Sequence, residues 1–129
     1  MTDKTPDAPA SILIIDDHPL LRRGISQLLE LEDDMTLIGE AGDPETGIRL
    51  ALELDPDMVL LDLNMPGLNG IETLKRLRDQ GFAGRVVMFT VSDHEEDVVA
   101  ALQGGADGYL LKDMDPDEMI RQLRQASLG

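Results

Sequence analysis

The feature that most constrains the fold of this chain is an unbroken apolar run that ends in an acid. The run Met58-Val59-Leu60-Leu61 leads directly into Asp62, and the chain then turns at Pro66-Gly67. A continuous run of this length is typical of a strand that is buried on both faces, as in a parallel sheet. Taken alone, an acid at this point also suits the start of a turn. In an open parallel sheet, however, it stands at the strand end where ligands bind.

Similar apolar runs alternate with helical patterns along the whole chain. We expect strands at residues 11–15, 35–41, 57–62, 85–89 and 108–111. Helices are expected from Pro19, from Pro44, from the loop after Asp62 to near Gly81, from about His94 to Gln103, and from Pro116. Strands that alternate with helices predict an α/β fold, here a flavodoxin-like, doubly wound, five-stranded parallel sheet of order 2-1-3-4-5 with five helices. The more polar strand 35–41 suits an edge of that sheet.

Local signals mark where several of these helices begin and end. Asp43-Pro44 and Asp115-Pro116 each place a capping acid before a first-turn proline. Asp17 or His18 precedes Pro19 in the same way, and Gly104-Gly105 ends the fourth helix.

Composition bounds the class of protein. The 129 residues suit one domain, which we place at residues 11–128 after a polar lead, residues 1–10, that we expect to be disordered. The chain has no cysteine, which excludes thiolate metal sites and thiol nucleophiles. Its net charge of −15 argues against direct binding of nucleic acid by this segment. No signal-peptide or membrane-spanning run is present in the sequence, so we expect a cytoplasmic protein with no membrane partner.

Three acids are expected to meet in the predicted sheet. Asp16 and Asp17 follow the first strand and Asp62 follows the third, and these two strands are neighbours in the order 2-1-3-4-5. Two carboxylates about 5 Å apart repel by about 3 kcal/mol at an effective dielectric constant near 20. A divalent cation that prefers oxygen would relieve this repulsion, and Mg²⁺ suits a site with few carboxylates and room for water.

Two further polar residues end strands on the same rim. Thr90 follows the fourth strand and Lys112 follows the fifth. A hydroxyl and an ammonium that face a metal-bound carboxylate can receive the oxygens of a phosphoryl group. The chemistry that fits is attack on phosphorus by Asp62, with Asp16 and Asp17 holding the metal.

Each of these residues also has a simpler interpretation. Asp16 and Asp17 can be a helix cap and an additional acid. Thr90 can be a β-branched strand residue, and Lys112 can be a solvated lysine at a strand end. Tyr109 can be an aromatic residue of the core. We interpret both histidines, His18 and His94, as surface residues without a partner. The acid pair, the central acid, the hydroxyl and the lysine, all at strand ends and in this order, favour the shared site.

These residues resemble the receiver domain of bacterial two-component response regulators over about residues 10–128. The matching segments are Ile15–Pro19, Leu61–Gly67, Thr90 and Gly105–Lys112. Asp-Asp-His-Pro at 16–19 and Gly-Ala-Asp-Gly-Tyr-Leu-Leu-Lys-Asp at 105–113 look like the NarL/FixJ subfamily, and residues 91–99 look most like its nitrate/nitrite regulators.

The resemblance implies a signalling phosphoacceptor rather than an enzyme. A sensor histidine kinase would phosphorylate Asp62, and Mg²⁺ would be held by Asp17, Asp62 and the backbone carbonyl of Asn64, with Asp16 acting partly through water. Lys112 would contact the phosphoryl group.

The family also implies how the signal would leave this domain. Thr90 and Tyr109 would form a switch pair. A C-terminal helix-turn-helix DNA-binding domain, absent from these residues, would be controlled by its release or by formation of a homodimer.

One position departs from the family, and two other classes compete with it. Many receivers follow the lysine with proline in a cis bond, whereas Asp113 stands here. Because a cis bond before a residue other than proline costs about 2.5–4 kcal/mol, we expect a trans bond. A haloacid-dehalogenase-type phosphatase would need its first two acids separated by one residue. A flavin-binding flavodoxin would need a phosphate loop without acids after the first strand.

Overall fold

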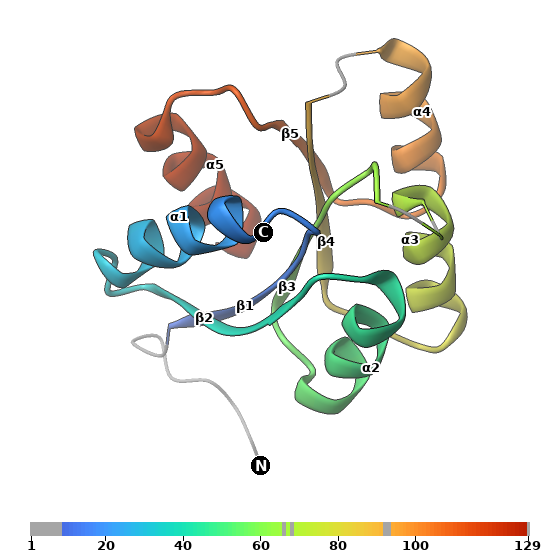
Figure 1. Cartoon of the computed structure of the whole chain (residues 1–129), viewed down its shortest axis with the longest axis horizontal. Coiled ribbons are helices and arrows are strands. Elements are labelled where there is room, and N and C mark those ends of the chain that lie inside the picture. The colour runs from blue at the N-terminus through green and yellow to red at the C-terminus, as the bar shows by residue number, and fades with distance from the viewer. Residues whose placement is uncertain (1–8, 66, 68, 92–93, 129) are drawn as a thin grey trace.

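The computed structural model describes residues 9–65, 67, 69–91 and 94–128, and in this part of the chain strands and helices alternate five times (Figure 1). The strands are β1 (Ala10–Ile15), β2 (Met35–Ala41), β3 (Met58–Leu61), β4 (Arg85–Thr90) and β5 (Gly108–Leu111). The helices are α1 (Pro19–Glu30), α2 (Pro44–Leu54), α3 (Gly70–Asp79), α4 (Glu95–Gln103) and α5 (Pro116–Leu128).

The strands form one parallel sheet in the order β2-β1-β3-β4-β5. This confirms the predicted order and the edge position of β2. Ile15 pairs with Leu61, and Leu61 pairs with Met88, so β1, β3 and β4 run in step. The residues that follow these strands are therefore carried to one edge of the sheet.

Helices cover both faces of the sheet and bury β3 between them. In Figure 1, α1 and α5 lie on one side of the sheet and α2, α3 and α4 on the other. Val59 and Leu61 belong to the core beneath α2, α3 and α4, whereas Met58 and Leu60 belong to the core beneath α1 and α5. Successive strand residues point to opposite faces, so an unbroken apolar run is what a strand between two helical layers requires.

The start of α3 lies unusually close to the end of β3. A Cβ atom added to Gly70 would lie 2.5 Å from the backbone oxygen of Asp62 and 2.6 Å from the Cα of Leu63. The Gly70 N–H donates to the Leu63 carbonyl at 2.7 Å. Glycine therefore permits the tight return of the chain after the central acid.

Element boundaries differ from the sequence prediction by one or two residues. The lead was expected to extend through residue 10, but this is wrong for Ala10, which begins β1 and donates its N–H to the Asp34 carbonyl at 2.9 Å. Residues 1–8 lie outside the described part of the chain. β3 is shorter than the predicted 57–62, because Asp57 and Asp62 flank it rather than belong to it.

Two further expectations concern the loops and the membrane. The described peptide bonds are all trans, which confirms the trans bond between Lys112 and Asp113. In the described residues, every helix is too short or too polar to cross a membrane.

Candidate functional site

The three predicted acids meet at the carboxyl ends of β1 and β3. The backbone carries them there, because the Asp62 N–H donates to the Ile15 carbonyl and the Asp16 N–H donates to the Ala41 carbonyl, each at 2.9 Å. One ligand atom from each of Asp16, Asp17, Asp62 and the neighbouring His18 lies within 4.8 Å of all the others. The convergence predicted from the strand order is confirmed.

Two of these acids are buried, and their oxygens are not fully satisfied. Asp16 is 1% exposed and Asp62 is 2% exposed. Within the described part of the chain, Asp16 Oδ2, Asp17 Oδ1 and Asp62 Oδ2 are buried, and their contacts are ion pairs with Lys112 and His18 rather than hydrogen bonds of good geometry. Buried charges are costly unless they are paired or bind a metal. This donor set of hard carboxylate oxygens suits a divalent cation such as Mg²⁺.

Lys112 supplies positive charge to the same cluster. Its Nζ atom lies 2.8 Å from Asp16 Oδ2 and 3.3 Å from Asp62 Oδ2, and its side chain is 10% exposed. The flexible stem of the lysine brings the ammonium to the acids from the end of β5. One ammonium offsets only part of the charge of three carboxylates.

The environment of Asp62 disfavours its ionised form. Burial raises the pKa of the Asp62 carboxyl above its ordinary value, and the nearby Asp16 carboxylate raises it further. The Lys112 ammonium and a hydrogen bond from the Asn64 N–H, at 3.2 Å from Asp62 Oδ1, act in the opposite direction. A further cation would therefore favour the carboxylate form that can act as a nucleophile.

The remaining predicted residues lie around this cluster. Asn64 is exposed and, with Lys112, helps to line a hollow of about 300 Å³ that opens over Asp62. Thr90 is fully buried at the end of β4, where it pairs with Leu111 of β5. Tyr109 is partly buried on β5 and packs against the core beneath α2, α3 and α4. Their assigned roles remain predictions.

Sequence reasoning missed the part of His18 in this site. The prediction that His18 is a surface residue is confirmed, but the prediction that it has no partner is wrong. The His18 Nδ1 atom lies 2.8 Å from Asp16 Oδ1 and 3.2 Å from Asp17 Oδ1, although 62% of its side chain is exposed. Its position directly after the acid pair is the signal that would have found it.

Arg22 is a second residue that sequence reasoning missed. Its Nη1 atom donates to the backbone carbonyl of Asp16, and its Nε atom donates to Glu40 Oε1 at 3.1 Å. The side chain thus ties the first turns of α1 to the loop that carries the acid pair. No pattern in the sequence singles out this arginine among the other helix arginines.

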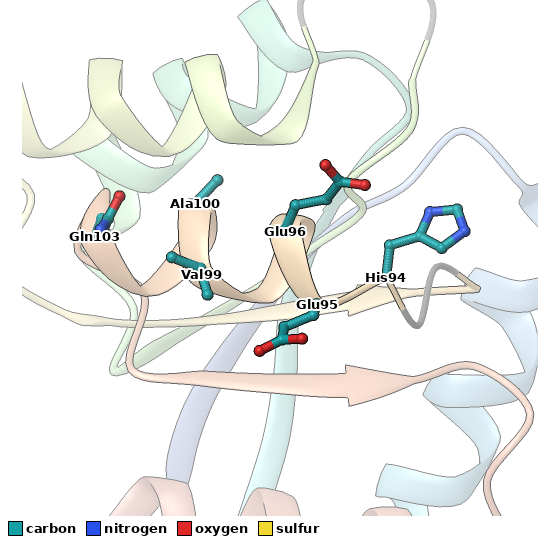
Figure 2. Close-up of a pocket in the computed structure, with 6 residues that line it drawn as sticks. All are labelled: His94, Glu95, Glu96, Val99, Ala100 and Gln103. Carbon is teal, nitrogen blue, oxygen red and sulfur yellow. The ribbon is translucent and has the colours of Figure 1, made fainter.

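A second hollow, of about 580 Å³, lies along α4 and is lined by residues from His94 to Gln103. Figure 2 shows the His94 ring at the start of this helix, with Glu95 and Glu96 projecting to different sides. Both acids are exposed, unlike Asp16 and Asp62. Among the described residues, the charged side chains that are both buried and close together are Asp16 and Asp62, which follow β1 and β3.

Comparison with known proteins identifies the family to which the chain belongs. The family model described as response regulator receiver domain matches residues 12–124. The chain belongs to this family. The matched range spans the acid pair, the central acid and the lysine of the cluster.

The receiver domain is similar to regulators of nitrate and nitrite response. It is 60% identical to the nitrate/nitrite response regulator protein NarL of Escherichia coli K12 over 94% of this chain and 56% of that protein. It is 48% identical to NarP of the same organism over 96% of this chain and 58% of that protein. The chain therefore spans little more than half the length of these relatives.

Solved structures show the same fold. The signal receiver domain of the putative response regulator NarL from Mycobacterium tuberculosis has a TM-score of 0.89 and 33% sequence identity, covering 95% of this chain and 98% of that one. The flavodoxin-like, receiver-type architecture predicted from the strand order is confirmed.

Proposed function

We propose that this receiver domain accepts a phosphoryl group on Asp62 from the phosphohistidine of a sensor histidine kinase. The observation that carries the proposal is the Asp62 carboxylate. It is buried at the end of the central strand, and its Oδ2 atom lies 3.3 Å from the Lys112 ammonium, which also pairs with Asp16.

The transfer follows from the position of these groups. A carboxylate oxygen of Asp62 forms a bond to phosphorus as the phosphorus–nitrogen bond of the donor breaks, and the departing imidazole keeps the electron pair and takes up a proton. The Lys112 ammonium stabilises the charge on the phosphoryl oxygens. The Thr90 hydroxyl, at the end of the neighbouring strand, is the second donor that we assign to the phosphoryl group.

Mg²⁺ is the cofactor that we assign to the acid cluster. Asp17, Asp62 and the Asn64 backbone carbonyl would hold it, with Asp16 acting partly through water. When bound, the ion would neutralise negative charge on the phosphoryl and carboxylate oxygens during transfer. The unsatisfied carboxylate oxygens and the raised pKa of Asp62 support this assignment.

We further propose that the chain signals to an output domain rather than acting as a turnover enzyme. The relatives that it matches extend well beyond it. A C-terminal helix-turn-helix domain, released or dimerised upon phosphorylation, would bind DNA in a nitrate or nitrite response. The net charge of −15 makes direct DNA binding by the receiver unfavourable. A cytoplasmic location fits this role.

The family match favours this function over the two alternatives. A haloacid-dehalogenase-type phosphatase and a flavin-binding flavodoxin would each place different residues after β1. Here Asp16 and Asp17 are adjacent, and their carboxylates in the loop after β1 would repel a flavin phosphate.

Mass spectrometry after incubation with acetyl phosphate tests the proposal. We expect the mass of one phosphoryl group to be added with Mg²⁺ present and lost with excess chelator. Asp62→Asn should remove the addition, whereas Asp113→Asn, a nearby exposed acid, should retain it. Equal phosphorylation of wild type and Asp62→Asn would refute Asp62 as the acceptor.

A further inference from the structure

Arg22 contacts the backbone of the acid pair from α1. Its Nη1 atom donates to the carbonyl of Asp16, which belongs to the peptide group that joins Asp16 to Asp17. The N–H of Asp16 donates to the Ala41 carbonyl at 2.9 Å. The two polar backbone groups of Asp16 are therefore held from two sides, one by the end of β2 and the other by α1.

The guanidinium of Arg22 is itself held in place. Its Nε atom donates to Glu40 Oε1 at 3.1 Å, and the side chain is 19% exposed. It lies over Gly42, where an added Cβ atom would be 3.3 Å from Arg22 Nη1. A planar guanidinium donates in fixed directions, so it can bind the Asp16 carbonyl and Glu40 at the same time. The contact thus joins α1 to the ends of both β1 and β2.

We propose that Arg22 is a positioning residue that orients the Asp16–Asp17 peptide group, and with it both acids, for binding Mg²⁺. This role rests on the proposed function, because it acts on acids that were assigned to that ion. Partners that orient the ligands of a metal are part of its site, and their loss typically weakens metal binding about 10–100-fold. Arg22 would act in this way through the backbone of the acid pair.

The positive charge of Arg22 would have the opposite effect. By Coulomb's law alone, removal of a positive charge beside the acids strengthens their attraction for Mg²⁺. Glu40 reduces this effect, because its carboxylate pairs with the guanidinium. Loss of orientation, in contrast, weakens binding. The sign of the change in Mg²⁺ affinity therefore separates an effect of position from an effect of charge.

Calorimetric titration of the chain with MgCl₂ at constant pH and ionic strength tests the role. The variant Arg22→Met removes the guanidinium and keeps an unbranched apolar stem. The matched control, Arg23→Met, removes the same charge from an exposed neighbour on α1. We expect Arg22→Met to raise the Kd for Mg²⁺ about tenfold. Arg23→Met should change the Kd less than about twofold, because the charge of an exposed side chain is screened by salt.

A third variant separates the shape of the guanidinium from its charge. Arg22→Lys keeps the positive charge but lacks the planar fork that holds two acceptors at once. We expect its Kd for Mg²⁺ to stay at least about threefold above that of wild type. Full recovery of Mg²⁺ binding in Arg22→Lys would show that the fork is not needed and would overturn the proposal.

NMR spectra recorded without Mg²⁺ provide a readout that does not require the ion. The Asp17 N–H belongs to the same peptide group as the Asp16 carbonyl, so Arg22→Met should shift its signal. Signals from α3 and α4, which lie on the other face of the sheet from α1, should stay as in wild type (Figure 1). Shifts of similar size throughout the chain would indicate a general structural role and overturn the proposal.

The titrations distinguish failure of this role from failure of the proposed function. Mg²⁺ binding that is unchanged or tighter in Arg22→Met would overturn the positioning role alone, because the wild type would still bind the ion. An equal loss of binding in Arg23→Met would also overturn it, since charge or helix stability would then explain the result. A wild-type chain that does not bind Mg²⁺ would overturn the cofactor assignment together with this role.

Discussion

The buried charge of Asp62 destabilises the folded chain, so we expect its removal to increase stability. Burial and Asp16 raise its pKa in the folded chain. A carboxyl whose folded pKa is raised stabilises the fold below the unfolded pKa, and this contribution is lost as the pH rises through the folded pKa. Without Mg²⁺ at near-neutral pH, Asp62→Asn should therefore increase the free energy of unfolding, by about 1–3 kcal/mol.

Urea unfolding of both proteins at several pH values checks this. The advantage of Asp62→Asn should shrink as the pH falls, because the wild-type carboxyl becomes protonated and uncharged. The exposed control Asp113→Asn should stay close to wild type at every pH. An Asp62→Asn variant that is less stable than wild type at near-neutral pH would contradict the prediction.

Thr90 is the residue through which we expect phosphorylation to reach β5. Its hydroxyl can move to a phosphoryl oxygen, and the vacated space can then accept Tyr109. A ligand shifts a conformational equilibrium only by its differential interaction with the two states, so loss of the hydroxyl should weaken the shift. In NMR spectra, Thr90→Ala should lose most of the phosphorylation-induced changes at residues 90–112.

A second buried threonine provides the control for Thr90. Thr73 lies on α3, and its hydroxyl donates to the Asn69 carbonyl at 2.8 Å. Thr73→Ala should keep the phosphorylation-induced changes although it also removes a buried hydroxyl. Identical changes in Thr90→Ala and wild type would rule out the switch.

At the scale of elements, the start of α2 depends on a side-chain cap that α4 lacks. Asp43 Oδ2 accepts from the Thr46 N–H at 3.0 Å, and this hydrogen bond lowers the pKa of Asp43. At α4, the cap residue His94 makes no such bond to its helix. Asp43→Ala should lower the free energy of unfolding by about 1 kcal/mol, and His94→Ala by less than about 0.5 kcal/mol.

Chemical denaturation of the two variants beside wild type measures the difference. Because the pKa of Asp43 is lowered in the folded chain, its carboxylate stabilises the fold at pH values above the unfolded pKa. This stabilisation is lost as the pH falls through the folded pKa, so the cost of Asp43→Ala should diminish in acid. A cost that is equal for Asp43→Ala and His94→Ala would contradict the assignment of the cap.

The elements themselves could be predicted because their signals are local. The apolar run at 58–61, the proline that opens each of α1, α2 and α5, and the polar edge strand β2 all lie within short stretches of sequence. The handedness of the crossover connections then allows only a few strand orders. The proximity of Asp16 and Asp62 could therefore be predicted from the sequence. Side-chain contacts such as His18 with Asp16 and Arg22 with the Asp16 carbonyl could not be predicted, since they depend on how α1 leaves the sheet.

For the whole molecule, the acid cluster links metal binding to folding. The three acids are near one another only in the folded chain, so Mg²⁺ binds that state in preference to the unfolded one. Such binding stabilises by RT ln(1 + [L]/Kd), or about 2.7 kcal/mol at a hundredfold excess over Kd. We expect the melting temperature to rise with Mg²⁺ and to level off only slowly at high concentration.

Thermal melts of wild type, Asp17→Asn and Asp113→Asn across a range of MgCl₂ concentrations test this link, with NaCl added to keep the ionic strength constant. Constant ionic strength is needed because a chain with a net charge of −15 gains stability from screening alone. Asp17→Asn should lose most of the rise, because it removes a ligand that is half-buried and paired only loosely with His18. Asp113→Asn should keep the rise. If the melting temperature of the wild type did not change with the Mg²⁺ concentration, the acids would not be arranged to bind the ion.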